Sequence, residues 1–274
     1  MLLRRTAIYE THQVESKFGA LMQKIVLNNK RTHTIVISDK LKFILEAVYS
    51  IKLTKCSVLH DAANDLVIKK ENKTSKVCNF VNDYKLKNGF AEVAGYFGHL
   101  YAGRGIDVIL DLASRNSEML FVICGGNPDQ VDNLKRQQFR TNVVVLGHQS
   151  YLDARRLMVT CDILLMPYQN AVSIGPVGSD TSRWMSPMKM FEYMETGKPI
   201  ISSNLVVLRE ILIDSDNALL VEPDNLEEWH AALKSLKNRS ELAVKIGENA
   251  RHHLLARHTW TMRAKEILHI LEKL

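Results

Sequence analysis

Short runs of aliphatic and β-branched residues alternate along the chain with longer stretches in which apolar side chains recur at helical spacing. This alternation is typical of parallel strands joined by crossover helices, so the sequence predicts an α/β fold. We expect three strands in the first third of the chain, at residues 6–9, 34–37 and 56–59. Six more are expected afterwards, at residues 92–97, 120–124, 142–146, 163–166, 199–202 and 218–221.

Several helices can be placed by an apolar stripe at helical spacing. Ser38 precedes one of them and is expected to cap it, and Asn225 with Glu228 forms a capping-box-like start for another. Two further helices, near residues 240–257 and 261–274, are expected to end the chain. The expected stripes are Leu41, Ile44, Leu45 and Val48; Ile106, Ile109, Leu110 and Ala113; and Leu226, Trp229, Leu233 and Leu236.

A polar segment separates the two groups of strands. Residues 61–88 are rich in Lys, Asn, Asp and Glu with little periodicity, which indicates a linker or a polar excursion. We place the domain boundary near Lys85, giving domains of residues 1–85 and 86–274. The second has the strands of a complete doubly wound domain, which usually has about six. The first shows about half that number, so we expect only part of a domain there.

Composition narrows the class of protein. The chain has 274 residues, 46% of them hydrophobic and 24% charged, as in ordinary globular proteins. It has no apolar run of about 18 residues and no signal-peptide pattern near Arg4 and Arg5, so we expect no membrane span and a cytoplasmic location. The cysteines lack the close spacing of zinc or disulfide sites, so we expect them to be reduced and without metal. They are Cys56, Cys78, Cys124 and Cys161.

The positive charge is concentrated at the start of the chain. Residues 1–88 hold 16 Lys or Arg against 8 Asp or Glu, whereas the net charge of the whole chain is +6. Such a bias suits an anionic partner such as lipid headgroups, phosphates or nucleic acid, and an ordinary solvated basic surface explains it as well. No aromatic-studded basic motif is present, so we do not expect nucleic acid binding.

A glycine-rich segment, AGYFGHLYAGRGID, follows the strand expected at residues 92–97. Its glycines, Gly95, Gly98, Gly103 and Gly105, would let backbone amides approach a phosphate at the start of the next helix. Arg104 would add a positive charge suited to phosphate. The spacing matches neither GxGxxG nor a Walker loop, and a tight turn with a surface arginine explains it equally well.

A second candidate anion site lies in SPMKMFEYMETGKPI, residues 186–200. Ser186 is expected as the helix N-cap and Pro187 as the first helical residue, so free amides, the Ser186 hydroxyl and Lys189 would converge at a positive dipole end. Glu192 lies three residues after Lys189, and an i, i+3 salt bridge is the simplest role for it.

Four blocks together resemble a known family. GYFGHLYAGRGID, CDILLMPYQ, SPMKMFEYMETGKPIISSNLVVLREIL and NALLVEPDN resemble, in order and spacing, the C-terminal half of GT-B-fold, family-4 retaining glycosyltransferases (glycosyl transferases group 1). The resemblance runs from about Glu92 to the C-terminus. AIYETHQ, HTIVISDKLK and CSVLHDAAND resemble the last part of the family's N-terminal domain, whose opening strands and glycine-bearing loop have no counterpart here.

The resemblance implies a GT-B-like fold with a complete C-terminal Rossmann-like domain that binds a nucleotide-diphosphate sugar. Residues 1–85 would be a truncated, acceptor-side unit, to which the last helix crosses back. Arg104 falls on the family's diphosphate-binding Lys and Glu192 on the Glu that holds the ribose hydroxyls. The donor-binding residues implied are Gly98, His99, Arg104, Ser186, Pro187, Met188, Lys189 and Glu192.

Two positions depart from the family pattern, and a third matches it and supplies a candidate catalytic residue. His99 stands where many members have a second phosphate-binding Arg, and histidine is mostly uncharged at neutral pH. Trp184 stands where the family often has a Glu. His12 matches the family His near the transferred sugar, and we expect it to position or polarise the substrate rather than to act as a nucleophile.

The activity implied is transfer of a sugar to a glycan or lipid-linked acceptor with retention, in polysaccharide or glycolipid biosynthesis, without cofactor or metal. Peripheral contact with the inner face of a membrane fits the basic first third. The alternative is a nucleotide-sugar-binding subunit or inactive fragment that needs a partner chain to supply the missing strands. A sugar-nucleotide epimerase on the same fold is a third hypothesis.

Three other features have both a functional and a plain interpretation. His60 and Asp61 could line the site or simply end a strand. The loop of residues 167–185, rich in turn formers including Gly175 and Gly178, could close on a ligand or be an irregular surface. Asp214 and Asp216 form a DxD, which suits a metal-bound diphosphate in another transferase fold, but an ordinary turn is expected here.

Overall fold

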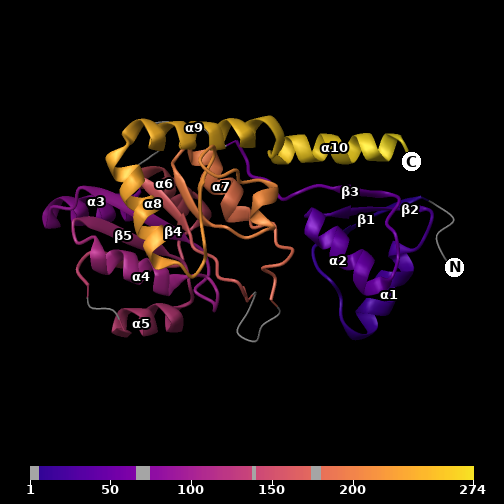
Figure 1. Ribbon diagram of the computed structural model, residues 1–274, viewed down its shortest axis with the longest axis horizontal. Helices are drawn as coiled ribbons and strands as arrows, with labels where there is room; N and C mark the ends of the chain where they lie inside the picture. Colours follow the sequence, from indigo (N-terminus) through magenta and orange to yellow (C-terminus); the bar gives the residue numbers. More distant parts are fainter. Residues whose placement is uncertain (1–5, 66–74, 138–139, 174–179) are drawn as a thin grey trace.

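The computed structural model describes residues 6–65, 75–137, 140–173 and 180–274 and arranges them around two parallel sheets (Figure 1). The first sheet has the order β1-β2-β3, with β1 at Ala7–Thr11, β2 at Thr32–Val36 and β3 at Cys56–Val58. Helices α1 (Lys17–Leu27) and α2 (Asp39–Tyr49) connect these strands and pack on one face. The predicted α/β class is confirmed.

The second sheet has six described strands in the order β6-β5-β4-β7-β8-β9. This is the doubly wound order, in which the chain reverses direction across the sheet between its first and fourth strands, here β4 and β7. Each predicted strand is present within two residues of its expected bounds. The strands are β4 Glu92–Phe97, β5 Met119–Cys124, β6 Val143–Gly147, β7 Ile163–Met166, β8 Ile200–Ser203 and β9 Leu219–Val221.

Helices cover both faces of this sheet, which explains why its strands are buried throughout. Helices α3 (Lys76–Asn88), α6 (Tyr151–Thr160) and α7 (Met188–Thr196) pack on one face. Helices α4 (Ile106–Arg115), α5 (Pro128–Gln137) and α8 (Leu226–Asn238) pack on the other (Figure 1). Helix α9 (Ser240–Arg257) contributes to both cores, and a 3-10 turn, η2, spans Leu208–Glu210.

Two helices begin at the caps that the sequence predicts. The hydroxyl of Ser38 accepts a hydrogen bond from the amide of Leu41, and Asn225 accepts one from the amide of Glu228. The stripe expected on α2 is wrong at one end, because Val48 is exposed and Tyr49 is buried in its place. The hydroxyl of Tyr49 donates to the buried side chain of Gln23 on α1, so a polar contact fixes which residue turns inward.

Two helices were not predicted. The segment expected as a linker contains α3, where Ser75 caps the first turn and Gly89, at a positive φ of 73°, ends the last. Lys85 therefore lies inside a helix, and Cys78 and Val81 are buried in the core of the second sheet. The other unexpected helix is α1, whose outward face carries an apolar stripe of Phe18, Leu21, Met22 and Ile25.

The last helix, α10 (Trp260–Glu272), lies beside the first sheet, on the side away from α1 and α2 (Figure 1). Its Arg263 donates to the carboxylate of Glu10 at 2.6 Å and to the carbonyl of His60 at 3.0 Å. Where α9 gives way to α10, the backbone pairs with residue Ala63, whose amide donates to the carbonyl of His258. The segment that leaves the first sheet and the junction of α9 and α10, which returns to it, therefore lie side by side.

Three of the four cysteines are buried. Cys78, Cys124 and Cys161 are buried, and Cys56 is half-buried. Burial raises the pKa of Cys124 to about 12 and that of Cys56 to about 11, and it also raises the pKa of Cys161. Among the described residues, no helix combines the length and apolar character needed to cross a membrane.

Candidate functional site

The candidate site lies at the carboxyl ends of β4 and β7, where the strand order of the second sheet reverses. Open α/β sheets bind ligands at such a point. Three segments meet there: the glycine-rich turn after β4, the loop after β7 and the start of α7. The hydroxyl of Tyr193 on α7 accepts from the amide of Phe97 at 2.8 Å and donates to the carbonyl of Leu165 at 3.3 Å, which fixes α7 against both strands.

Glycine is required in the turn because other groups approach its backbone closely. A Cβ at Gly103, where φ is 81°, would lie 1.8 Å from the carbonyl oxygen of Ala171 in the loop after β7. A Cβ at Gly98, where φ is 145°, would lie 2.7 Å from Nζ of Lys189. Gly98 therefore leaves room for a cation, and Gly103 for the neighbouring loop.

Arg104 is not the surface arginine of the simpler hypothesis. Its guanidinium donates to the hydroxyl of Tyr168 at 3.0 Å and to the carbonyl of Ser173 at 3.2 Å. It lies 5.2 Å from the centroid of the Tyr168 ring, and its Nε is buried without a hydrogen-bond partner. The loop after β7 thus holds the guanidinium in place while one of its N–H groups stays unsatisfied.

Among the described residues, Lys189 has no ion pair at its amine. Its Nζ is buried without a hydrogen-bond partner and lies 4.1 Å from the ring centroid of Tyr96 and 5.0 Å from that of Tyr168. Burial holds the pKa of this amine well below its usual value, and the positive charge of Arg104 lowers it further. Two buried cationic groups with free N–H bonds share one site, and an anion would satisfy both.

The start of α7 differs from the prediction by one residue. Pro187 is the N-cap and Met188 the first helical residue. The Ser186 hydroxyl does not cap α7, because it accepts a hydrogen bond of 2.9 Å from the amide of Asp61. The sequence alone assigns the Ser186 hydroxyl to the start of α7, but in the structure this hydroxyl binds Asp61, in the segment that leaves the first sheet.

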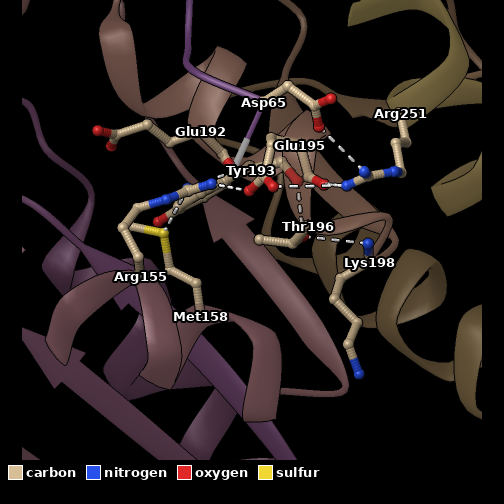
Figure 2. Close-up of polar contacts among 9 residues, drawn as sticks. All are labelled: Asp65, Arg155, Met158, Glu192, Tyr193, Glu195, Thr196, Lys198 and Arg251. Carbon is tan, nitrogen blue, oxygen red and sulfur yellow. Dashed lines mark hydrogen bonds and ion pairs between the residues drawn. The ribbon is translucent and has the colours of Figure 1, made fainter. Parts of the chain in front are cut away.

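Glu192 lies one turn into α7 and is partly buried. Burial raises the pKa of its carboxyl, an effect that the charges of Arg155 and Lys189 oppose. Within the described part of the chain it forms no ion pair with Lys189, so the simple i, i+3 salt bridge is absent. Its carboxylate extends away from Arg155 and Glu195 and remains available to a ligand (Figure 2).

His99 lies beside the two cations as a neutral group. Its ring stacks on that of Tyr101 with centroids 5.0 Å apart. Burial lowers the pKa of His99, and the positive charges of Arg104 and Lys189 lower it further. It can therefore offer a hydrogen bond but not a second charge.

Trp184 joins the two parts of the molecule. Its ring packs against the core of the first sheet, and its carbonyl accepts from the Ser38 hydroxyl at 2.8 Å. Glu210 lies in the same region, and its carboxylate accepts hydrogen bonds from the amides of Asp39 and Lys40. The same carboxylate lies 2.8 Å from Nε2 of His60. The strand-end His60 is thus bound to a residue of the second unit.

His12 follows β1, and 53% of its side-chain surface is exposed. Its Nε2 lies 2.8 Å from the Glu10 carboxylate, which also binds Arg263. Burial raises the pKa of Asp61, and the charge of His12 opposes that rise, so the two side chains are within electrostatic range. Asp61 in turn contacts Ser186, which places His12 on the side of the first unit that faces α7.

The loop after β7 is ordered by its own polar groups where it is described. Asp180 accepts from the amides of Val172 and Ser182, and the Ser182 hydroxyl donates to the carbonyl of Asn170. Gly175 and Gly178 lie outside the described residues. Asp214 accepts from the amide of Leu220, so the DxD forms a turn before β9. No cluster of three or more potential metal ligands was found in the described ranges.

Comparison with known proteins gives a family for this arrangement. A model of the family described as glycosyl transferases group 1 matches residues 83–253. Two curated relatives from Methanocaldococcus jannaschii, the uncharacterized glycosyltransferases MJ1178 and MJ1069, are 25% identical over 184 residues and 23% identical over 235 residues. These matches cover 66% and 81% of this chain but 48% and 57% of the relatives, so the chain spans about half their length.

Solved structures share the fold at low identity. Anabaena Alr3699/HepE in complex with UDP and glucose is 18% identical with a TM-score of 0.74, and the match covers 99% of this chain and 72% of that one. A glycosyltransferase from Rickettsia africae is 17% identical with a TM-score of 0.77, over 97% of this chain and 70% of that one.

Proposed function

Because the chain belongs to the glycosyl transferases group 1 family, we propose that it transfers a sugar from a nucleotide-diphosphate sugar to a glycan or lipid-linked acceptor. The proposal includes retention of the anomeric configuration and a place in polysaccharide or glycolipid biosynthesis. It is supported by the glycosyltransferase relatives and by the UDP complex of the structurally similar HepE.

The observation that carries the proposal is a pair of basic side chains, Arg104 and Lys189, with unsatisfied nitrogen atoms. Buried polar groups in proteins nearly always have hydrogen-bond partners, yet Nε of Arg104 and Nζ of Lys189 have none among the residues that the structure describes. Both lie at the switch point of the second sheet, beside the first turn of α7, where helix geometry leaves the amides of Met188 and Lys189 without intrahelical acceptors. A diphosphate has the charge and the oxygen atoms to accept hydrogen bonds from both groups.

In this proposal each candidate residue has its own role. Arg104 and Lys189 stabilise the charge that develops on the diphosphate as the sugar leaves, without a metal ion. Glu192 accepts hydrogen bonds from the ribose hydroxyls, and His99 donates to the phosphates as a neutral ring. His12 positions or polarises the transferred sugar. Gly98, Ser186, Pro187 and Met188 shape the phosphate side of the pocket.

Calorimetric titration with a panel of nucleoside diphosphates and their sugars, with and without EDTA, tests the proposal. We expect one nucleotide to bind with micromolar affinity, independent of EDTA. Arg104→Ala should weaken that binding by more than tenfold, because it removes a charged donor. Arg136→Ala removes the same side chain from the exposed face of α5 and should leave affinity unchanged. Equal affinity of both variants would overturn the assignment of Arg104.

A second candidate is a nucleotide-sugar-binding subunit whose acceptor site needs a partner chain. It is favoured by the first sheet, in which β1 pairs only with β2 among the described strands and α1 exposes its apolar stripe. Sugar transfer by the isolated chain to a glycan or lipid-linked acceptor would support the enzyme. Nucleotide binding without transfer, restored by a co-purifying chain, would support the subunit.

We further propose a cytoplasmic protein that contacts the inner face of a membrane peripherally. The basic first third of the chain supports this contact, because anionic headgroups attract Lys and Arg near the surface. Lys265 of α10 and Lys273, which directly follows that helix, add to the positive charge beside the first sheet.

A further inference from the structure

Helix α7 is held at its far end by a group of charged residues that meets the candidate ligand site only through the backbone carbonyl of Glu192. We call Arg155, Glu195, Arg251 and Asp65 the α7 network (Figure 2). Arg155 on α6 and Glu195 on α7 form an ion pair in which the side chains are 1% and 2% exposed. Such burial is costly for two charges and persists only when geometry and further hydrogen bonds compensate.

Arg155 reaches the turn of α7 that carries the candidate ribose-binding residue. One nitrogen of its guanidinium donates to the carbonyl of Glu192 at 2.6 Å, and the other donates to the Glu195 carboxylate. A single side chain therefore holds the backbone under Glu192 and the last turn of the helix together. Tyr193 fixes the middle of α7 to the sheet, and Arg155 adds a second, independent constraint on its rotation.

Arg251 continues the network outward to the connection between the two units. It donates to the carbonyl of Glu195, and its other nitrogen lies 3.2 Å from the carboxylate of Asp65. Asp65 follows Ala63, which pairs with the junction of α9 and α10. Because Ser186 accepts from the amide of Asp61, this same segment binds α7 near both of its ends.

We propose that the α7 network positions α7 for nucleotide binding and couples that position to the segment connecting the two units. Arg155 and Glu195 are positioning residues that act through the backbone of Glu192 and the orientation of Lys189. The inference rests on the proposed function for its ligand, but the position of α7 is a property of the free protein.

Paired substitutions separate positioning from simple stability. Glu195→Met leaves the Arg155 charge buried without its ion-pair partner, and Arg155→Met leaves the Glu195 carboxylate with Arg251 as its remaining partner, so each should lower Tm. The double variant removes both charges with side chains of similar size and should recover much of that Tm. Arg156→Met is the matched control, because Arg156 lies on the same helix and forms a part-exposed pair with Asp153 at 3.3 Å.

Titration with UDP, or with whichever nucleoside diphosphate the wild-type chain binds, gives the first result. If the binding-competent orientation of α7 falls to a tenth of the population, the Kd of the double variant rises about tenfold despite its recovered Tm. Asp65→Asn, which changes a half-exposed side chain away from the ligand site, should raise the Kd about threefold by the same reasoning. Arg156→Met should bind as the wild type does.

Hydrogen exchange of the ligand-free proteins gives the second result, independent of any nucleotide. Amides of residues 190–194 should exchange about fivefold faster in the double variant and in Asp65→Asn than in wild type or Arg156→Met. Wild-type exchange and affinity in both variants would overturn the proposal. If the wild-type chain binds no nucleotide, the proposed function fails, and the exchange rates still decide whether the network positions α7.

Discussion

Binding of a nucleoside diphosphate should place a proton on Lys189. In the free protein, burial and the charge of Arg104 hold the pKa of this amine well below its usual 10.5, so the neutral form is populated between the lowered pKa and 10.5. A diphosphate brings negative charge close to Nζ, favours the ammonium form and raises the pKa. Proton uptake therefore accompanies binding wherever the pH lies between the free and bound pKa values.

The size of this effect follows from linkage. In that pH window one proton is taken up per ligand, so the association constant falls by up to about tenfold for each unit of rising pH. Folding responds in the opposite direction, because the unfolded chain, with an ordinary lysine pKa, binds more protons than the folded one. The contribution of Lys189 to the free energy of unfolding thus rises with pH, by up to about 1.4 kcal/mol per unit, from the lowered pKa to 10.5.

Calorimetry in two buffers of different ionisation enthalpy measures the protons taken up. The titrations belong above about pH 7.5, where the terminal phosphate of the nucleotide, with a pKa of about 6, is already ionised. Wild type should take up as much as one proton per ligand where the pH lies between the free and bound pKa values of Lys189, and Lys189→Met should lack this uptake. Equal proton uptake by the two proteins throughout this range would refute the assignment of Lys189 as the buried, nucleotide-facing amine.

Three other changes test the fold around the site. Gly103→Ala places a Cβ 1.8 Å from the carbonyl of Ala171 at a positive φ, and should cost about 1–3 kcal/mol in urea unfolding; an unchanged midpoint would contradict the close approach of the two loops. Ser38→Ala removes a helix cap and the hydrogen bond to Trp184, and should cost about 1 kcal/mol by the same measurement. Anionic vesicles should co-sediment the protein at low salt and release it at about 1 M, where screening extends to about 3 Å; no co-sedimentation at low salt would remove the membrane proposal.

The strands of both sheets could be predicted from the sequence because their apolar runs are bounded by turn residues. The sequence was insufficient for α3, whose buried positions Cys78 and Val81 are too few to stand out among lysines and asparagines. The helix packs against the second core through these two residues together with Val77 and Tyr84, a tertiary contact that no local periodicity reports. Helix α1 was missed for a related reason, since its apolar stripe faces outward and its inward face includes the polar Gln23.

At the candidate site, the sequence indicated the cations but not their surroundings. Arg104 and Lys189 were expected to meet a phosphate, yet nothing local indicated that the rings of Tyr96 and Tyr168 flank the lysine amine. The N-cap was misplaced because the partner of Ser186 is Asp61, 125 residues earlier in the chain. The only sequence signal for the α7 network is an arginine at an inward position of α6, which is uncommon unless an acid pairs with it.

The burial of the thiols has a practical consequence for measuring distances. At neutral pH the raised pKa values leave Cys56 and Cys124 almost entirely protonated, and the thiolate is the form that reacts with alkylating dyes. Fluorophores can therefore be attached to single cysteines introduced at exposed positions, such as Lys24 on α1 and Lys135 on α5, without first removing the native ones. Energy transfer between these two labels would follow the spacing of the two sheets in solution as ligands are added.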